Sequence, residues 1–100
     1  MILEHADIRI APGRHAEFEE AIHRGLTTVI ARAPGFLNAK VVRGIESTER
    51  FVLMIEWETL EAHTEGFRNS PLFAEWRAIV GPFFAGPPTV EHFSFTAAKA

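Results

Sequence analysis

The chain of 100 residues contains no cysteine and no tyrosine. Without cysteine it can form neither disulfide bonds nor thiolate metal sites, and it cannot use a thiolate as a nucleophile. No apolar run approaches the roughly 20 residues that cross a bilayer. The first ten residues, MILEHADIRI, carry charges where a signal peptide needs an apolar centre. We therefore expect a soluble, cytoplasmic protein with no membrane partner.

Basic runs and cofactor motifs are also absent. The formal net charge is −3, with acidic and basic residues interspersed, which argues against nucleic acid or an anionic membrane as the main partner. There is no G-x-G-x-x-G turn or P-loop, and the histidines show no H-x3-H spacing. The sequence thus predicts no nucleotide, flavin or metal cofactor.

Apolar residues are abundant for a chain of this length. They make up 47% of the sequence and include nine Phe and two Trp. We expect one domain over residues 1–100, with 96–100 as a tail. A domain of this length buries a smaller share of its surface than a larger one. The chain therefore packs very densely or shares apolar surface with a second copy.

Two hydrophobic periods divide the chain into strands and helices. Alternation at period 2 predicts strands, and apolar residues three and four positions apart predict helices. The strands are expected at 2–10, 36–43, 50–58 and 89–95, and the helices at 14–33, 60–68 and 70–83. Thr59 and Ser70 are expected as N-caps of the last two helices, with Pro71 in the first turn.

This order predicts an α+β, ferredoxin-like fold. In the βαββαβ arrangement, the helices cover one face of a four-stranded antiparallel sheet. The other face would carry Val52 and Met54 beside a polar set. That set comprises His5, Asp7, Arg9, Asn38, Lys40 and Glu56. Because an apolar sheet face is not stable in water, we expect a homodimer through this face.

Four stretches resemble a known family. They are APG before the first helix, APGF before the second strand, FVLMIEWETLEAHTEGFRNSPLF, and GPFFAGPPTVEHF. Together they resemble the antibiotic biosynthesis monooxygenase (ABM) domain family, whose members form dimeric α+β barrels of about this length. The resemblance covers nearly the whole chain, and its most specific part is the W-x5-H element formed by Trp57 and His63.

The resemblance implies a cofactor-independent monooxygenase. Its substrates would be molecular oxygen and a quinol- or anthrone-type polycyclic phenol. Once deprotonated, such a phenol can pass an electron to oxygen, so the protein need supply only a base, a dry aromatic pocket and a few hydrogen bonds. The alternatives are a non-catalytic module that binds a small aromatic metabolite and a purely structural domain.

Among the functions found in this family, haem binding or degradation is less favoured for this chain than cofactor-independent oxygenation. The haem-degrading members use an Asn, a Trp and a His at positions that correspond here to Ala6, Phe67 and Arg77. The axial ligand and two donors are therefore missing. The lack of tyrosine also excludes any family mechanism that uses a phenol as proton donor.

His63 is the candidate catalytic residue. It shares a helix face with Leu60 and Phe67, and an ordinary imidazole pKa suits a general base near neutral pH. A core-edge histidine bonded to a backbone carbonyl fits the same spacing. We expect His63 at the rim of a pocket, where truncation to alanine would cost less than about 1.5 kcal/mol.

Four other residues are candidates for substrate binding. Trp57, Phe67 and Trp76 would form aromatic walls, and Arg68 would lie near the mouth. Trp57 shares a strand face with Phe51, Leu53 and Ile55, and a tryptophan in that setting is more often a core residue than a stacking platform.

The remaining charged candidates are less informative. Arg68 and Arg77 could contact an anionic oxygen, but solvated surface positions are the more common ones for such arginines. His15 and His23 on the long helix are expected to be exposed and without function. His92 on the last strand is compatible with either face of the sheet.

Overall fold

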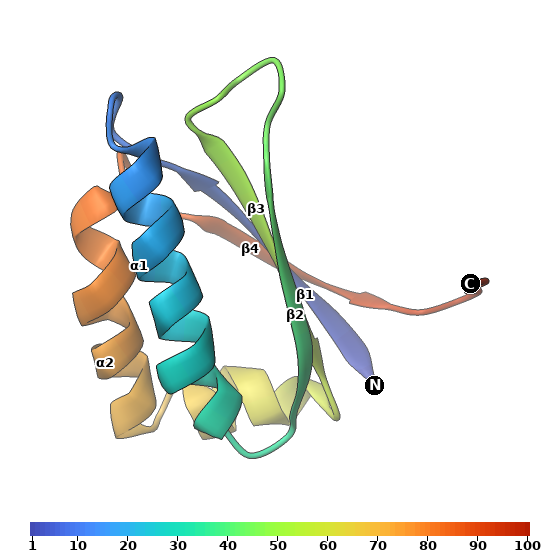
Figure 1. Cartoon of the computed structure of the whole chain (residues 1–100). Helices are drawn as coiled ribbons and strands as arrows, with labels where there is room; N and C mark the ends of the chain where they lie inside the picture. Colours follow the sequence, from blue (N-terminus) through green and yellow to red (C-terminus); the bar gives the residue numbers. More distant parts are fainter.

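The computed structural model describes all 100 residues and contains the expected order of strands and helices. The elements are β1 (Ile2–Arg9), α1 (His15–Thr28), β2 (Phe36–Arg43), β3 (Arg50–Trp57), α2 (Pro71–Val80) and β4 (Thr89–Ser94). The strands form one antiparallel sheet in the order β2-β3-β1-β4. Both long helices lie on the same face of the sheet (Figure 1). The predicted ferredoxin-like α+β fold is confirmed.

Three short helical segments complete the chain and differ from the predicted boundaries. They are η1 (Ile30–Arg32), η2 (Ala62–Phe67) and η3 (Gly81–Phe83). The predicted helix over 14–33 ends as α1 at Thr28, and the chain then tightens into the 3₁₀ turn η1. The predicted helix over 60–68 is mostly a π-helix, in which Arg68 N–H donates to the His63 carbonyl at 3.1 Å. No helix is both long and apolar enough to cross a membrane.

The two predicted caps are present. The Thr59 hydroxyl accepts a hydrogen bond from the Ala62 backbone N–H at 3.1 Å. The Ser70 hydroxyl accepts from the Leu72 N–H at 3.2 Å, and Pro71 occupies the first position of α2. These bonds satisfy backbone donors that have no partner within the first helical turn.

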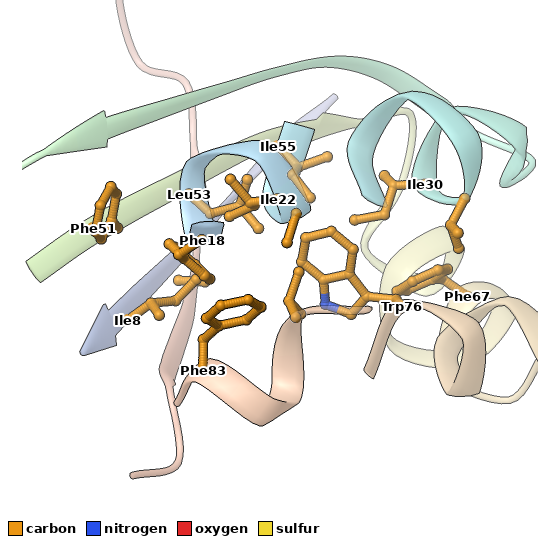
Figure 2. Close-up of a cluster of buried hydrophobic side chains, with 14 of the residues drawn as sticks. Ile8, Phe18, Ile22, Ile30, Phe51, Leu53, Ile55, Phe67, Trp76 and Phe83 are labelled. Atoms are coloured by element: carbon orange, nitrogen blue, oxygen red, sulfur yellow. The ribbon is translucent and has the colours of Figure 1, made fainter. Parts of the chain in front are cut away.

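The core lies between the sheet and the helices. β3 alternates as expected, and Phe51, Leu53, Ile55 and Trp57 all point toward the helices and are buried. Side chains from β1, α1 and α2 close this layer, and Figure 2 shows Trp76 pointing into the cluster.

The helices approach each other at Gly25 of α1. A Cβ atom at this position would lie 2.7 and 2.8 Å from two ring carbons of Trp76 on α2. Such separations are far shorter than carbon–carbon contact allows. The missing side chain of Gly25 therefore provides the space that the Trp76 indole occupies.

The opposite face of the sheet is covered by no other part of the chain (Figure 1). It combines apolar side chains with polar pairs, and Phe93 and Val42 are each 47% exposed. The Arg50 guanidinium makes hydrogen bonds of 3.1 and 2.6 Å to the Asp7 carboxylate, and these hold the pKa of Asp7 below its ordinary value. Asn38 donates to Glu56 at 3.0 Å. The mixed apolar and polar face predicted from the sequence is thus present.

The two histidines of α1 differ from each other. His23 is exposed, as expected. The expectation was wrong for His15, which is half-buried with its ring centroid 6.5 Å from that of Phe51. Its position at the start of α1 turns the ring toward the sheet rather than toward solvent.

Gly25→Ala should destabilise the protein even though alanine favours helix formation. The new methyl group must displace the Trp76 ring, and overpacking of this kind costs about 1–3 kcal/mol. Gly66→Ala in η2 is the matched control, because its Cβ would meet nothing closer than a backbone oxygen at 3.7 Å. Denaturant melts should show a loss of stability for Gly25→Ala only; equal stability of the two variants would contradict the packing argument.

Candidate functional site

Glu4 of β1 is a carboxylic acid buried among the apolar side chains of the core. It is 5% exposed and lies on the same strand face as Ala6 and Ile8. Sequence analysis did not identify it, although its position two residues from Ala6 places it on the apolar side of the alternation. A buried carboxyl group is costly unless its oxygens find donors, so its partners define the site.

Trp57 provides one of these partners. Its indole Nε1–H donates a hydrogen bond of 3.0 Å to Glu4 Oε1. The β1–β3 register pairs Trp57 with Ile2, two residues before Glu4, and the Trp57 side chain is 0% exposed. Trp57 therefore takes the core position that its strand face allows, and its ring stacks on His63 with 5.4 Å between centroids.

His63 of η2 provides the second partner. Its Nε2 lies 3.3 Å from Glu4 Oε1, and its Nδ1 lies 2.8 Å from Nε2 of His92. Its side chain is buried and not at a rim, so that expectation was wrong. Both ring nitrogens face side chains, which also overturns the alternative of a bond to a backbone carbonyl. Truncation would leave Glu4 and His92 each short of a partner, a larger cost than expected.

His92 of β4 points toward the helix-covered face, which settles its orientation. In the register between β1 and β4 it stands directly opposite Glu4. Strand β1, segment η2 and strand β4 therefore bring Glu4, His63 and His92 into one continuous chain of ionisable groups.

Burial shifts the pKa values of these groups toward their neutral forms. It raises the pKa of Glu4 to about 7, although the Trp57 hydrogen bond and the positive charge of Arg68 act in the opposite direction. Burial lowers the pKa of His63 to about 4, and the charges of Arg68 and His92 add to this effect. The pKa of His92 is also lowered, mainly by burial. The group that titrates near neutral pH is thus Glu4 and not His63, contrary to expectation.

The chain of three groups accommodates both states of Glu4. With Glu4 ionised, neutral His63 can donate from Nε2 to the carboxylate and accept at Nδ1 from His92. With Glu4 protonated, the acid can donate to Nε2, and His63 can donate from Nδ1 to His92. Both arrangements use a neutral imidazole with one donor and one acceptor. A proton can therefore enter or leave Glu4 by reversal of the same hydrogen bonds.

Glu4 and His63 both face a cavity of about 250 Å³ between the sheet and the helices. Most of its wall is apolar, and the aromatic part consists of Phe67, Phe73, Trp76 and Phe84. Of the residues expected at the site, His63, Phe67, Arg68 and Trp76 line this cavity. Trp57 does not, because its ring is covered by His63 and Phe67; its contribution is the hydrogen bond to Glu4.

Two arginines complete the lining. Arg68 follows η2, and Arg77 lies on α2 with its guanidinium carbon 5.9 Å from the centre of the Phe73 ring. Both side chains are exposed, while the acid and the histidine of the same cavity are buried. The cavity thus combines a buried acid–histidine pair, aromatic walls and two cationic groups that reach solvent.

Comparison with known proteins agrees with this architecture. The family model for the antibiotic biosynthesis monooxygenases matches residues 1–79. The uncharacterised protein YczJ of Bacillus subtilis (strain 168) is 41% identical over 93 residues, which span 93% of this chain and 97% of that protein.

Two solved structures illustrate the range of similarity. A Bordetella bronchiseptica protein described as an antibiotic biosynthesis monooxygenase superposes with a TM-score of 0.90 at 38% identity, over 96% of this chain and 97% of that one. The monooxygenase from the gene ActVA-Orf6 of Streptomyces coelicolor, solved with nanaomycin D, gives a TM-score of 0.82 at 22% identity, over 99% and 90%. The second similarity concerns the fold alone.

Glu4→Gln should gain stability relative to the wild type as the pH rises from 4.5 to about 7. The folded-state pKa of Glu4 lies above its ordinary value, so in this window the folded protein keeps a proton that the unfolded chain releases. The wild type therefore loses stability as the pH rises through the window, and the glutamine variant lacks this loss. Denaturant melts at a series of pH values measure the difference.

His63→Gln should show the opposite dependence. The pKa of His63 falls from 6.5 to about 4 on folding, so in that window the unfolded chain binds a proton that the folded protein does not. The wild type gains stability from this group as the pH rises, and the variant should fall behind it. Parallel profiles for the two variants would contradict the opposed shifts.

Proposed function

Because the chain belongs to the antibiotic biosynthesis monooxygenase family, we propose that it is a cofactor-independent monooxygenase in which Glu4 deprotonates an electron-rich phenol. The observation that carries this proposal is the buried Glu4–His63 pair in the wall of the cavity, with an acid whose pKa lies near 7. A general base is most effective when its pKa lies near the working pH.

The reaction needs no external reductant. Removal of the phenolic proton gives an electron-rich anion that can transfer an electron to molecular oxygen. In an anthrone-type substrate, a CH₂ group becomes a carbonyl: one oxygen atom of O₂ becomes the carbonyl oxygen, and the other leaves as water with the two hydrogens of that carbon. The substrate loses four electrons and oxygen gains four, so the electrons balance between the two reactants.

Three polar residues of the cavity have distinct roles in this scheme. Glu4 takes the proton, and His63 passes it toward His92, which is only half-buried. The positive charge of Arg68 favours the ionised form of Glu4, and it favours a phenolate for the same reason. Phe67 and Trp76 offer apolar surface to the substrate ring and exclude water from it.

Oxygen uptake in the presence of quinols and anthrones tests the proposal. The protein should consume one oxygen molecule per substrate molecule converted, faster than spontaneous oxidation. Glu4→Gln should reduce kcat by about 10²–10⁴, the usual contribution of a positioned base. Glu61→Gln, an exposed glutamate without a side-chain partner on the segment that leads into η2, should behave as the wild type.

The pH dependence adds a second criterion. The rate should rise through about pH 7 as Glu4 ionises, and this limb should be missing in Glu4→Gln. Substrate binding without oxygen uptake would identify a non-catalytic aromatic-binding module. Full activity of Glu4→Gln would exclude Glu4 as the base.

We further propose that the protein works as a homodimer that joins the two uncovered sheet faces. The support is the mixed character of this face, which exposed Phe93 and Val42 share with the Asp7–Arg50 pair. Exposed apolar patches of this kind mark interaction sites, and a two-fold axis would set each patch against its own copy.

Light scattering should give twice the mass of one chain at micromolar concentration. Phe93→Glu combined with Val42→Glu should shift the protein to a monomer, because charges would be buried without partners. Leu60→Glu is the control, since Leu60 is 40% exposed but lies outside the sheet. A stable wild-type monomer would rule out this assembly.

A further inference from the structure

The arginines of the chain fall into two groups. Five of the eight form ion pairs with a carboxylate: Arg14, Arg24, Arg32, Arg43 and Arg50. Arg9, Arg68 and Arg77 form none, and two of these three line the same cavity. The cavity therefore holds two guanidinium groups whose hydrogen-bonding capacity is not used within the protein.

The charges in the cavity are unbalanced. Glu4 is the only acidic side chain in its wall, and it is already hydrogen-bonded to Trp57 and close to His63. Burial keeps Glu4 partly protonated near neutral pH, and His63 is neutral there. The remaining charge comes from Arg68 and Arg77, so the field inside the cavity attracts an anion.

We propose that the ligand is a hydroxylated aromatic carboxylic acid of one or two rings, whose carboxylate is bound by Arg68 and Arg77 while its hydroxyl group reaches Glu4 and His63. This inference rests on the proposed function and defines the class of substrate. The guanidinium group matches the planar carboxylate, with which it can form two parallel hydrogen bonds. The aromatic ring lies against Phe67, Phe73 and Trp76.

The volume of the cavity limits the number of rings. An apolar cavity of about 150 Å³ holds a benzene ring. The cavity of about 250 Å³ has room for one further ring, and three fused rings would exceed it. The polycyclic substrate expected from the sequence is thus limited to two rings at most.

Calorimetric titration with stable probes tests the charge requirement without turnover. 6-Hydroxy-2-naphthoic acid carries its two groups at opposite ends of a two-ring system, and its methyl ester is the neutral analogue. The acid should bind at least about tenfold more tightly than the ester, as expected for charge-assisted hydrogen bonds. In the Arg68→Gln, Arg77→Gln double variant, this preference should fall below about threefold while the affinity for the ester stays unchanged.

Arg24→Gln is the control variant, because Arg24 lies on α1 away from the cavity and is exposed. It should keep the full preference for the acid. Anthracene-2-carboxylic acid should bind more weakly than 2-naphthoic acid. Equal affinity for acid and ester, or a preference for the acid that survives in the double variant, would contradict binding of the carboxylate by Arg68 and Arg77. Tighter binding of the three-ring acid would contradict the limit of two rings.

The outcomes for the ligand and for the reaction can be separated. Preference for the acid in a protein that consumes no oxygen would support the aromatic acid as ligand and contradict the monooxygenase. Rapid oxidation of a neutral quinol by a protein that binds the acid no more tightly than the ester would support the monooxygenase activity and contradict the aromatic acid as the ligand.

Discussion

The burial of Glu4 is the constraint on which the arrangement of the site depends. A carboxyl group in an apolar core is tolerated only where donors and acceptors surround it. Those partners come from different parts of the chain: Trp57 ends β3, and His63 lies on η2, where its other ring nitrogen contacts His92 of β4. The contacts of one acid, extended through His63 to His92, thus fix the position of η2 against three strands of the sheet.

Glu4 is difficult to explain as a stabilising residue. An apolar side chain of similar size would pack against Ala6 and Ile8 without any cost of desolvation, and buried ionisable groups rarely outperform such replacements. The raised pKa of Glu4 and the lowered pKa of His63 are measures of that cost. Perturbed groups that meet in a cavity are typical of functional sites. This is the physical argument for chemistry at Glu4, and it is independent of the family.

The sequence predicted the fold well because two clear periods define it, but it predicted the site only in part. The alternation of β3 correctly placed Trp57 inside, and the W-x5-H spacing pointed to His63, which lies in the wall of the cavity. Glu4 was missed because an acid on an apolar strand face was not treated as part of that face. The contact between His63 and His92 depends on strand register and on the π-helical turn of η2, which rotates residues differently from an α-helix. Neither feature has a signature in local periodicity.

The charge of Arg68 links ligand binding to the protonation of the buried groups. Its positive charge lowers the pKa values of Glu4, His63 and His92 alike. A carboxylate bound to Arg68 would neutralise much of that charge, so the proton affinity of all three groups would rise on binding. By thermodynamic linkage, an aromatic acid would bind more tightly when Glu4 is protonated, and a bound acid would make Glu4 a stronger base. Arg68, which binds the carboxylate of the proposed substrate, would in this way also raise the basicity of Glu4, which removes the proton of the substrate.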